Sequence, residues 1–116
     1  MAKTNTAYIP GEYNTGVVRG DTFSETATFI TGGEPLNLAG AAIRIQLRTR
    51  SGEVVASLEG GSGIQTVGNV MTWTIEGATT AGFAVGQYLY DIEITLGGST
   101  RTYAAGSFAV QKDITA

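Results

Sequence analysis

The sequence predicts an all-β protein, and three features of its 116 residues support that prediction. Apolar and polar residues alternate along several short runs, which is the pattern of strands with one buried and one solvated face. Seventeen glycines and only two prolines indicate many turns between short strands. No stretch has the long apolar periodicity of the amphipathic helices that an α/β fold requires. A hydrophobic content of 42% is sufficient for the core of one domain.

Residues 1–14 have no clear period and predict an extended N-terminal arm, followed by a domain over residues 15–116. A frayed tail is one interpretation, since chain termini usually fray. The other is an arm that docks on a neighbouring subunit, because aromatic side chains anchor interfaces. Three large apolar residues, Tyr8, Ile9 and Tyr13, make the arm a candidate subunit interface.

The first long strand is expected over residues 22–30, which alternate imperfectly. Phe23, Ala27 and Phe29 share one face with Glu25, which is the odd member of an otherwise apolar face. Turn-forming residues at 31–35 end the strand.

The clearest alternation lies in residues 36–58, which predict a hairpin with a break at residues 50–52. Its first strand alternates apolar with polar residues in the order Ile43, Arg44, Ile45, Gln46, Leu47 and Arg48. Arg44 and Arg48 on the wet face are candidates for charged contacts with an acidic neighbour. Plain solvated surface is the alternative, and the sequence leaves both open.

Four further strands are expected, over residues 64–67, 70–75, 86–96 and 101–110. Glycine-containing turns separate them, because glycine takes positive φ without strain. Trp73 is expected to fill the core, and the last strand is expected to contain a bulge at Gly106.

Residues 76–83 are rich in small side chains and predict one helical turn crossing between two sheets. Seven or eight short strands with one short helical turn are typical of an immunoglobulin-like antiparallel β-sandwich. The disulfide of antibody domains is excluded, because the chain has no cysteine.

Composition also excludes several classes of function. A net charge of −3 without a basic stripe argues against nucleic acid as a partner. The absence of His and Cys removes the usual general base, the thiolate nucleophile and the commonest metal ligands. We therefore expect no enzymatic activity, catalytic residue, cofactor or metal. The chain has no apolar run long enough to cross a membrane and no signal-peptide pattern at its start, so synthesis in a cytoplasm is expected.

Two short motifs favour a structural interpretation. Arg19-Gly20-Asp21 spells the tripeptide that integrins recognise, but Gly20 is well placed to turn the chain between two strands. Asp91 and Glu93 share a strand face, which is more often a solvated rim than an acid pair.

Three tyrosines, Tyr88, Tyr90 and Tyr103, suggest a sugar-stacking platform as one alternative. Packing in the core or at an interface is favoured, because Ile92 and Ile94 continue the face of Tyr88 and Tyr90. A carbohydrate-binding module that contacts a host surface therefore remains the rival function.

Several motifs resemble, in their order along the chain, those of small phage and prophage virion proteins. They are Arg19-Gly20-Asp21-Thr22-Phe23, Pro35-Leu36-Asn37-Leu38-Ala39-Gly40-Ala41, Ile43-Arg44-Ile45-Gln46-Leu47-Arg48, Ser51-Gly52-Glu53-Val54, Ala78-Thr79-Thr80-Ala81-Gly82-Phe83 and Gly86-Gln87-Tyr88-Leu89-Tyr90-Asp91-Ile92-Glu93. The resemblance includes the immunoglobulin-like N-terminal domain of phage baseplate upper proteins and covers residues 17–110.

The resemblance implies a non-enzymatic structural protein of the virion, made in the host bacterial cytoplasm. Its partners would be other tail, baseplate or capsid subunits, with the chain present as a homo-oligomer or in repeated copies. Baseplate proteins carry a receptor-binding or helical extension that is not found in this sequence. Two locations are therefore expected, a tail or baseplate adaptor first and a capsid decoration (cement) protein second.

Overall fold

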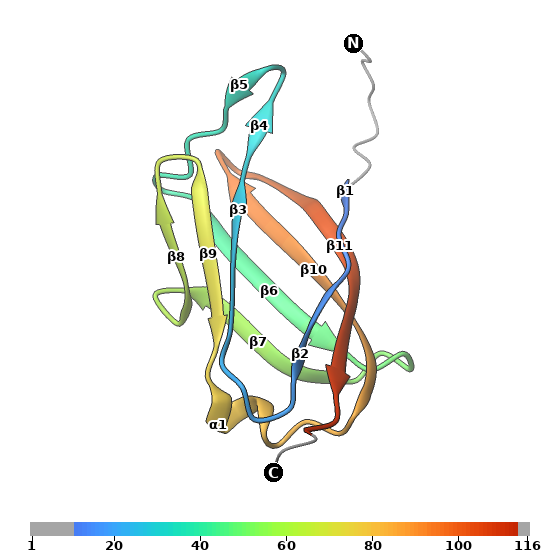
Figure 1. The fold of residues 1–116 in the computed structure, drawn as a ribbon. Helices are drawn as coiled ribbons and strands as arrows, with labels where there is room; N and C mark the ends of the chain where they lie inside the picture. The colour runs from blue at the N-terminus through green and yellow to red at the C-terminus, as the bar shows by residue number, and fades with distance from the viewer. Residues whose placement is uncertain (1–10, 114–116) are drawn as a thin grey trace.

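The computed structural model describes residues 11–113, which fold into two β-layers packed face to face (Figure 1). The predicted immunoglobulin-like β-sandwich with one short helical turn is confirmed. In chain order the elements are β1 (Gly11–Glu12), β2 (Thr15–Val18), β3 (Phe23–Thr28), β4 (Ile30–Thr31), β5 (Glu34–Pro35), β6 (Ala42–Arg48), β7 (Val54–Gly60), β8 (Gly63–Val67), β9 (Val70–Ile75), α1 (Gly77–Thr80), β10 (Gly86–Leu96) and β11 (Ser99–Gln111).

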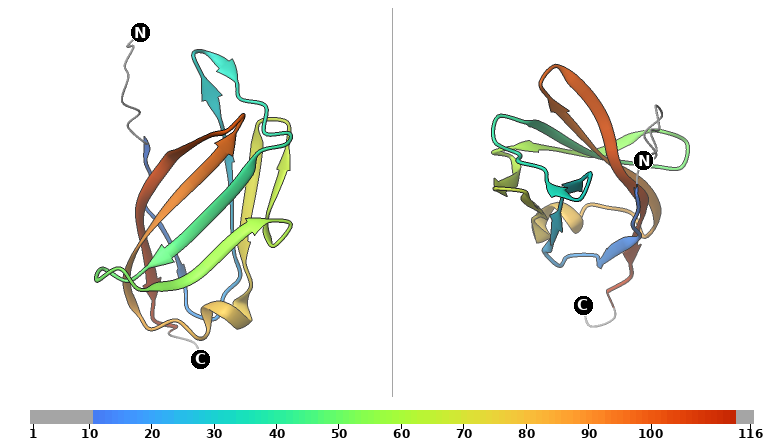
Figure 2. Two further views of the ribbon diagram at one scale, coloured as in Figure 1. Left: turned by 180° about the vertical axis from the view of Figure 1, so that it is seen from behind. Right: turned by 90° about the horizontal axis from the view of Figure 1, so that it is seen from above.

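The larger layer contains β11, β10, β6 and β7, with β1 and β2 added to the outer side of β11. Figure 2 shows these strands from behind as one twisted layer. The smaller layer contains β8, β9 and β3, and the hairpin of β4 and β5 extends beyond it. Sandwiches of this class divide their strands between two such sheets.

The predicted hairpin of residues 36–58 is present as β6 and β7. The two strands are antiparallel, with Ile45 opposite Leu58. On its other side β6 pairs with β10, so the strand lies between two partners and alternates strictly between buried and less buried residues. Ile43, Ile45 and Leu47 are its buried face, as the period-2 pattern predicted.

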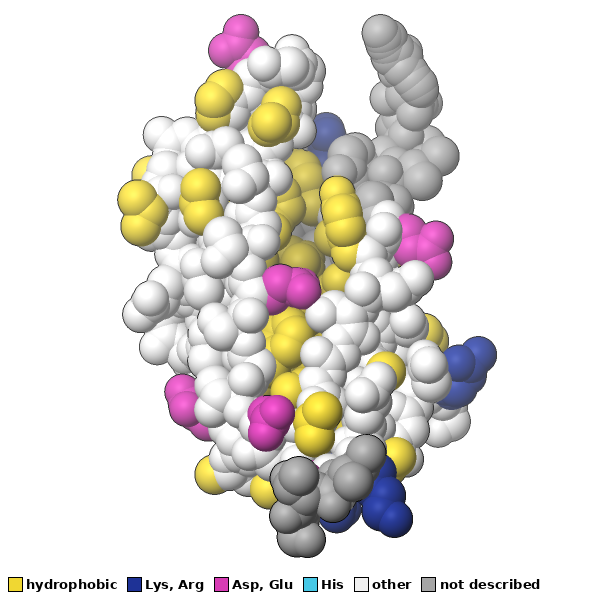
Figure 3. Space-filling view, viewed as in Figure 1, with side chains coloured by type: hydrophobic (Ala, Val, Ile, Leu, Met, Phe, Trp, Pro, Cys, Tyr) yellow, Lys and Arg dark blue, Asp and Glu magenta, His cyan; other side chains and the backbone are white. Residues whose placement is uncertain are grey.

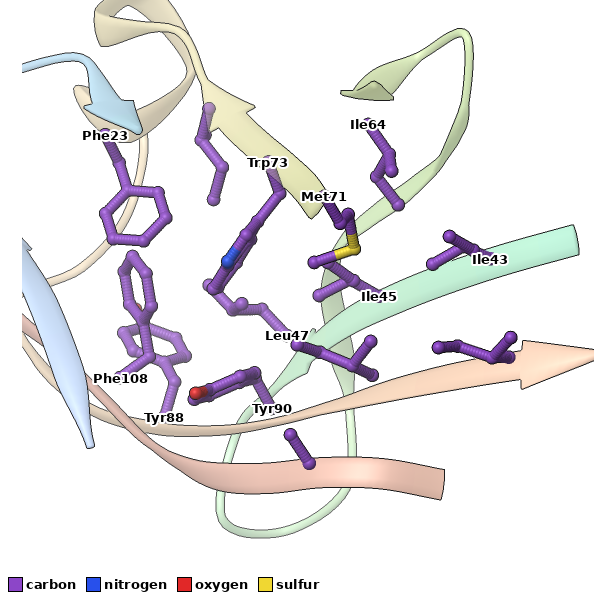
Figure 4. Close-up of a cluster of buried hydrophobic side chains, with 14 of the residues drawn as sticks. Phe23, Ile43, Ile45, Leu47, Ile64, Met71, Trp73, Tyr88, Tyr90 and Phe108 are labelled. Atoms are coloured by element: carbon purple, nitrogen blue, oxygen red, sulfur yellow. The ribbon is translucent and has the colours of Figure 1, made fainter. Parts of the chain in front are cut away.

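The core lies between the layers and is rich in aromatic rings (Figure 4). Trp73 is buried, as predicted, and its ring centroid is 4.6 Å from that of Phe23 and 5.2 Å from that of Tyr90. Phe23 in turn lies 5.0 Å from Phe108. Offset and edge-on ring pairs of this kind add to the burial of apolar area. The rings therefore join β3, β9, β10 and β11 into one core.

The helical turn α1 connects β9 to β10 and holds the turn between β2 and β3. Its Thr80 side chain is fully buried. The Thr80 hydroxyl donates a hydrogen bond to the Asp21 carbonyl oxygen (2.7 Å) and accepts one from the Gly20 amide (3.0 Å). Gly20 has φ of +95°, which favours glycine. The Arg19-Gly20-Asp21 motif is thus part of a turn that is fixed from within.

Two details differ from the prediction based on sequence. The long strand pairs are antiparallel, but β1 and β2 lie parallel to β11, and the short contact between β7 and β8 is also parallel. The two-residue strands β1, β4 and β5 are additional, because runs this short carry no recognisable period.

The predicted bulge at Gly106 is wrong in position. The register shift lies opposite the step from Ile92 to Glu93, where Tyr103 is the extra residue. Gly106 instead lets Tyr13, the residue after β1, approach β11, because a Cβ atom on Gly106 would collide with the Tyr13 carbonyl oxygen. The glycine is required by the close contact between strands rather than by a bulge.

Candidate functional site

An opening between the two layers is the main candidate site. It lies between β3 of the small layer and β1 with β11 of the large layer, and its volume is about 680 Å³. Figure 3 shows hydrophobic side chains exposed along the gap between the two layers. Trp73, Tyr90 and Ile92 line its floor, so the opening reaches the core. We call this opening the seam.

Strand β3 forms one wall of the seam and is an edge strand. Within residues 11–113 it pairs only with β9, along the whole run from Phe23 to Thr28. The backbone groups on its other side face the seam. Unpaired edge strands are templates for the addition of another strand.

The opposite wall is β1, which is fixed to β11. The Tyr13 amide donates a hydrogen bond to the Ala105 carbonyl oxygen (2.9 Å). The Asn14 side-chain oxygen accepts hydrogen bonds from the amide (3.0 Å) and the hydroxyl (3.1 Å) of Ser107. These contacts hold residues 12–14 on the sheet, so this wall is preformed.

Glu25 gives the seam its acidic character. It lies on the inward face of β3 between Phe23 and Ala27, and it is partly buried. Its carboxylate accepts a hydrogen bond from the Thr15 hydroxyl (2.9 Å), which links β3 to β2 across the opening. Glu12 on the opposite wall also lines the seam, and no Lys or Arg of the described chain does.

The Tyr90 hydroxyl lies at the floor of the seam. It donates a hydrogen bond to the Tyr13 carbonyl oxygen (2.8 Å) and so supports β1 from below. Burial, followed by the nearby Glu25 carboxylate and Tyr13, raises the pKa of Tyr90 to about 12. The phenol therefore remains neutral and keeps its donated hydrogen bond at physiological pH.

The apolar rim continues beyond β3. Phe29 contacts Tyr103 edge-on, with ring centroids 6.0 Å apart, so these two rings meet across one end of the opening. Tyr13 is 63% exposed and Ile30 is 65% exposed, although both side chains are large and apolar. Exposed apolar groups that gather at one opening indicate an interaction site.

Of the predicted interface residues that lie within residues 11–113, only Tyr13 lines the seam. Tyr8 and Ile9 lie outside the described residues. Arg44 and Arg48 are on the outer face of the large layer, away from the seam. Residues 11–14 of the predicted arm lie against β11.

The outer face of the large layer carries its own polar contacts. Arg44 forms an exposed ion pair with Glu93 at 3.0 Å. Arg48 donates hydrogen bonds to the Gly52 carbonyl oxygen (3.2 Å) and to Gln46. Partial burial and the adjacent Glu93 carboxylate raise the pKa of Asp91, and the two arginines oppose this rise. Because exposed pairs of this kind contribute little, the face resembles solvated surface.

The geometry also bears on the other candidate chemistries. Tyr88 and Tyr90 are 6% and 4% exposed, so their rings are core residues and offer no stacking platform. Among residues 11–113, no group of three or more Asp, Glu, His or Cys side chains is placed to hold a metal ion. No helix in that part of the chain is long and apolar enough to cross a membrane.

The sequence contains one signal for the seam, the charged residue Glu25 on an otherwise apolar strand face. Glu25 interrupts the apolar face of residues 22–30, and the structure places it where the two layers open. A charged residue on a core-facing strand position is expected only where the side chain reaches water or a partner. Ile30 gave no such signal, because its exposure follows from the β4–β5 hairpin.

Comparisons with known proteins give similarity in fold alone. No family model matches the chain, and no curated protein is similar to it in sequence. CopC from Methylosinus trichosporium OB3b is 14% identical, with a TM-score of 0.47 over 89% of this chain and 88% of that chain. A family 123 glycoside hydrolase from Clostridium perfringens is 15% identical, with a TM-score of 0.41 over 91% of this chain. The match spans 24% of the hydrolase. Similarities at this level carry no functional argument.

Proposed function

We propose that this chain is a non-enzymatic structural protein of a tailed phage particle, which binds other virion subunits and is present in repeated copies. A tail or baseplate adaptor is the first candidate, and a capsid decoration protein that stabilises the head is the second. The observation that carries the proposal is the free edge of β3 beside the seam, whose rim carries exposed apolar side chains. The motifs that resemble virion proteins name the class of partner.

A protein that works by binding needs a rigid platform and a surface that a partner completes. The sandwich provides the platform, since β6 and β10 are each paired on both sides. The β3 edge provides backbone hydrogen-bonding groups, and the rim with Tyr13 and Ile30 provides apolar area. Strand addition combines these contributions, because backbone hydrogen bonds give affinity and side-chain pockets give specificity.

The rival function, a carbohydrate-binding module, loses its main support. It relied on Tyr88, Tyr90 and Tyr103, and the first two are buried. Their hydroxyls also donate to backbone carbonyl oxygens, Tyr88 to Ala84 at 2.6 Å and Tyr90 to Tyr13 at 2.8 Å. Of the three rings, Tyr103 is the one that stays half-buried, and it packs edge-on against Phe29, so a sugar would have to stack on this ring alone.

The test is the presence of the chain in purified particles. Phage produced by the bacterial strain that carries the coding sequence would be separated on a density gradient into intact particles, heads and tails. Quantitative mass spectrometry should find the chain in several copies per particle and cross-linked to tail or baseplate subunits. Enrichment in heads would instead favour capsid decoration. Absence from particles would contradict the proposal.

A matched pair of variants tests the predicted interface residues. Tyr13→Ala removes an exposed aromatic ring at the seam, and we expect it to lower incorporation into particles several-fold. Arg44→Ala removes only an exposed ion pair with Glu93 and should leave incorporation nearly unchanged. A glycan array with the purified chain completes the comparison, and specific glycan binding together with absence from particles would revive the rival function.

A further inference from the structure

We infer that the seam binds, as an added β-strand, residues 4–9 of a second copy of this chain. The inference rests on the proposed function, because it names the partner of the β3 edge in an assembly of repeated copies. Chain direction, segment length, charge and composition identify the occupant.

The small layer has one strand fewer than its fold class provides. In constant-type immunoglobulin sandwiches the first strand lies beside the second, in a four-stranded sheet. Here the first strand, β2, pairs with β11 of the opposite layer, so β3 ends the small layer. The position beside β3 is therefore open to a strand from outside the described residues.

The open part of the seam has the length of one short strand. Its wall runs from Glu25 to Thr28 on β3 and continues through Phe29 to Ile30 of β4, which together are six residues or about 20 Å of extended chain. Towards Phe23 the gap is bridged by the hydrogen bond between Glu25 and Thr15. A six-residue segment thus matches the length of the opening, whose other end is closed by the ring contact between Phe29 and Tyr103.

The charge of the seam matches the composition of residues 1–10. Glu12 and Glu25 face the opening, and no basic residue lines it. Residues 1–10 contain Lys3 and no acidic residue. Within this segment Thr4-Asn5-Thr6-Ala7-Tyr8-Ile9 is six residues long and includes β-favouring threonine, tyrosine and isoleucine.

Chain direction favours a second copy over the chain's own segment. Gly11 pairs with Ala104 at the wall of the seam, and β1 runs from there parallel to β11 along the opening (Figure 1). To enter its own seam, the preceding segment would have to reverse within Pro10 and Gly11 and run back against β1. A segment from another copy enters in either direction without this constraint.

The experiment uses the absence of native cysteine in the full-length chain. One copy carries either Thr6→Cys or Ala7→Cys. Side chains at successive positions of a strand point to opposite faces, so whichever register the added strand adopts, one of the two cysteines lies on the face of the partner cysteine. The other copy carries Thr28→Cys on β3. Equimolar mixtures are oxidised gently, and covalent heterodimers are counted on a non-reducing gel. A disulfide requires Cα atoms about 4.4–6.8 Å apart, so the reaction reports close contact.

The matched control places the second cysteine at Ser57, which is exposed on β7. We expect several-fold more heterodimer with Thr28→Cys than with Ser57→Cys, and a marked loss when Ile9→Asp is added to the copy that donates the segment. Equal yields at the two positions, or no heterodimer, would overturn the inference. A chain carrying both cysteines that cross-links only within itself would also overturn it, in favour of the chain's own segment.

The cross-linking experiment and the particle test can have opposite outcomes, so a failure of this inference is distinguishable from a failure of the proposed function. The cross-linking uses purified chain alone, so it does not depend on a virion. If the chain is abundant in particles but no heterodimer forms, the added strand comes from another virion protein and only this inference falls. If heterodimers form but particles lack the chain, the second copy stands as partner and the virion function falls.

Discussion

Single polar side chains hold segments together at positions where the alternation of apolar and polar residues is interrupted. Thr80 is buried and bonds the β2–β3 turn, and Tyr90 supports β1 through the Tyr13 carbonyl oxygen. Glu25 bridges two layers through Thr15. Thr80 and Tyr90 join segments that are far apart in the sequence, and Glu25 joins two successive strands, so none of the bonds is visible in local periodicity.

Replacing Thr80 should destabilise the protein through the lost hydroxyl rather than through lost volume. Thr80→Val keeps the shape but leaves the Gly20 amide and the Asp21 carbonyl oxygen without this partner. We expect a loss of about 1–3 kcal/mol in the free energy of unfolding. Thr80→Ser keeps the hydroxyl and should lose about 1 kcal/mol, the value of one buried methyl group. Urea unfolding followed by Trp73 fluorescence measures both, and equal losses would contradict the assigned role.

Because the pKa of Tyr90 is raised in the folded protein, we expect the free energy of unfolding to fall at alkaline pH. Its pKa is raised to about 12 in the folded protein from 10.0, so the unfolded chain releases this proton first as pH rises. The contribution of Tyr90 to stability is therefore constant below about pH 10 and declines from there towards pH 12. Tyr90→Phe should have a flatter stability profile in this range, at the cost of its hydrogen bond at neutral pH.

Tyr88→Phe is the control, because Tyr88 also donates to a backbone carbonyl oxygen, that of Ala84. Unfolding by urea at several values between pH 9 and 12 compares the slopes. If Tyr90→Phe declines as steeply as the unmodified chain, burial of the Tyr90 phenol is not the cause of the alkaline loss.

The contact of Tyr13 and Asn14 with strand β11 depends on one glycine. A Cβ atom at Gly106 would meet the Tyr13 carbonyl oxygen, and the Asn14 side-chain oxygen would lie 3.1 Å away. Gly106→Ala should therefore displace β1 and cost about 2–3 kcal/mol, as overpacked sites do. Gly60→Ala is the matched control, because Gly60 has open space around its Cβ position and no positive φ. Thermal unfolding by circular dichroism measures both variants, and similar melting temperatures would show that β1 accommodates the methyl group.

The long strands were predictable, including the edge strand β3, whereas the two-residue strands and the parallel pairings were not. The pattern of Ile43, Ile45 and Leu47 located β6, and residues 86–96 were predicted with the observed bounds of β10. Both strands bury one face in the core between the layers, so apolar and polar residues alternate along them. The parallel placement of β2 on β11 followed from no local signal, because its partners are more than ninety residues apart.

The candidate site was likewise predictable only in part. The sequence predicts Tyr13 as an interface residue and shows Glu25 as an exception on an apolar face, but the seam exists only because β2 joins the opposite layer. Arg44 and Arg48 are predicted interface residues because of their charge, and the structure places them on the outer face of the large layer. The alternation of apolar and polar residues reveals single exceptions such as Glu25. The opening itself depends on how distant strands pair, which local alternation does not show.

At the scale of the whole molecule, the protection of backbone amides should differ between the two layers. In the large layer β10 is paired with both β6 and β11, so its amides are held on two sides. In the small layer β3 pairs only with β9 and faces the seam on its other side. Local opening is easiest where backbone hydrogen bonds are fewest and most exposed to solvent.

Hydrogen–deuterium exchange with mass spectrometry should therefore show slow exchange in peptides from β10 and faster exchange in peptides from β3. If a strand is added at the seam in an assembly, exchange in β3 should slow several-fold on assembly while that in β10 changes little. Peptides from β7, which lies away from the seam, provide the internal control. Equal slowing throughout the chain would indicate general stabilisation rather than an added strand. Unchanged exchange in β3 would show that partners bind elsewhere on the sandwich.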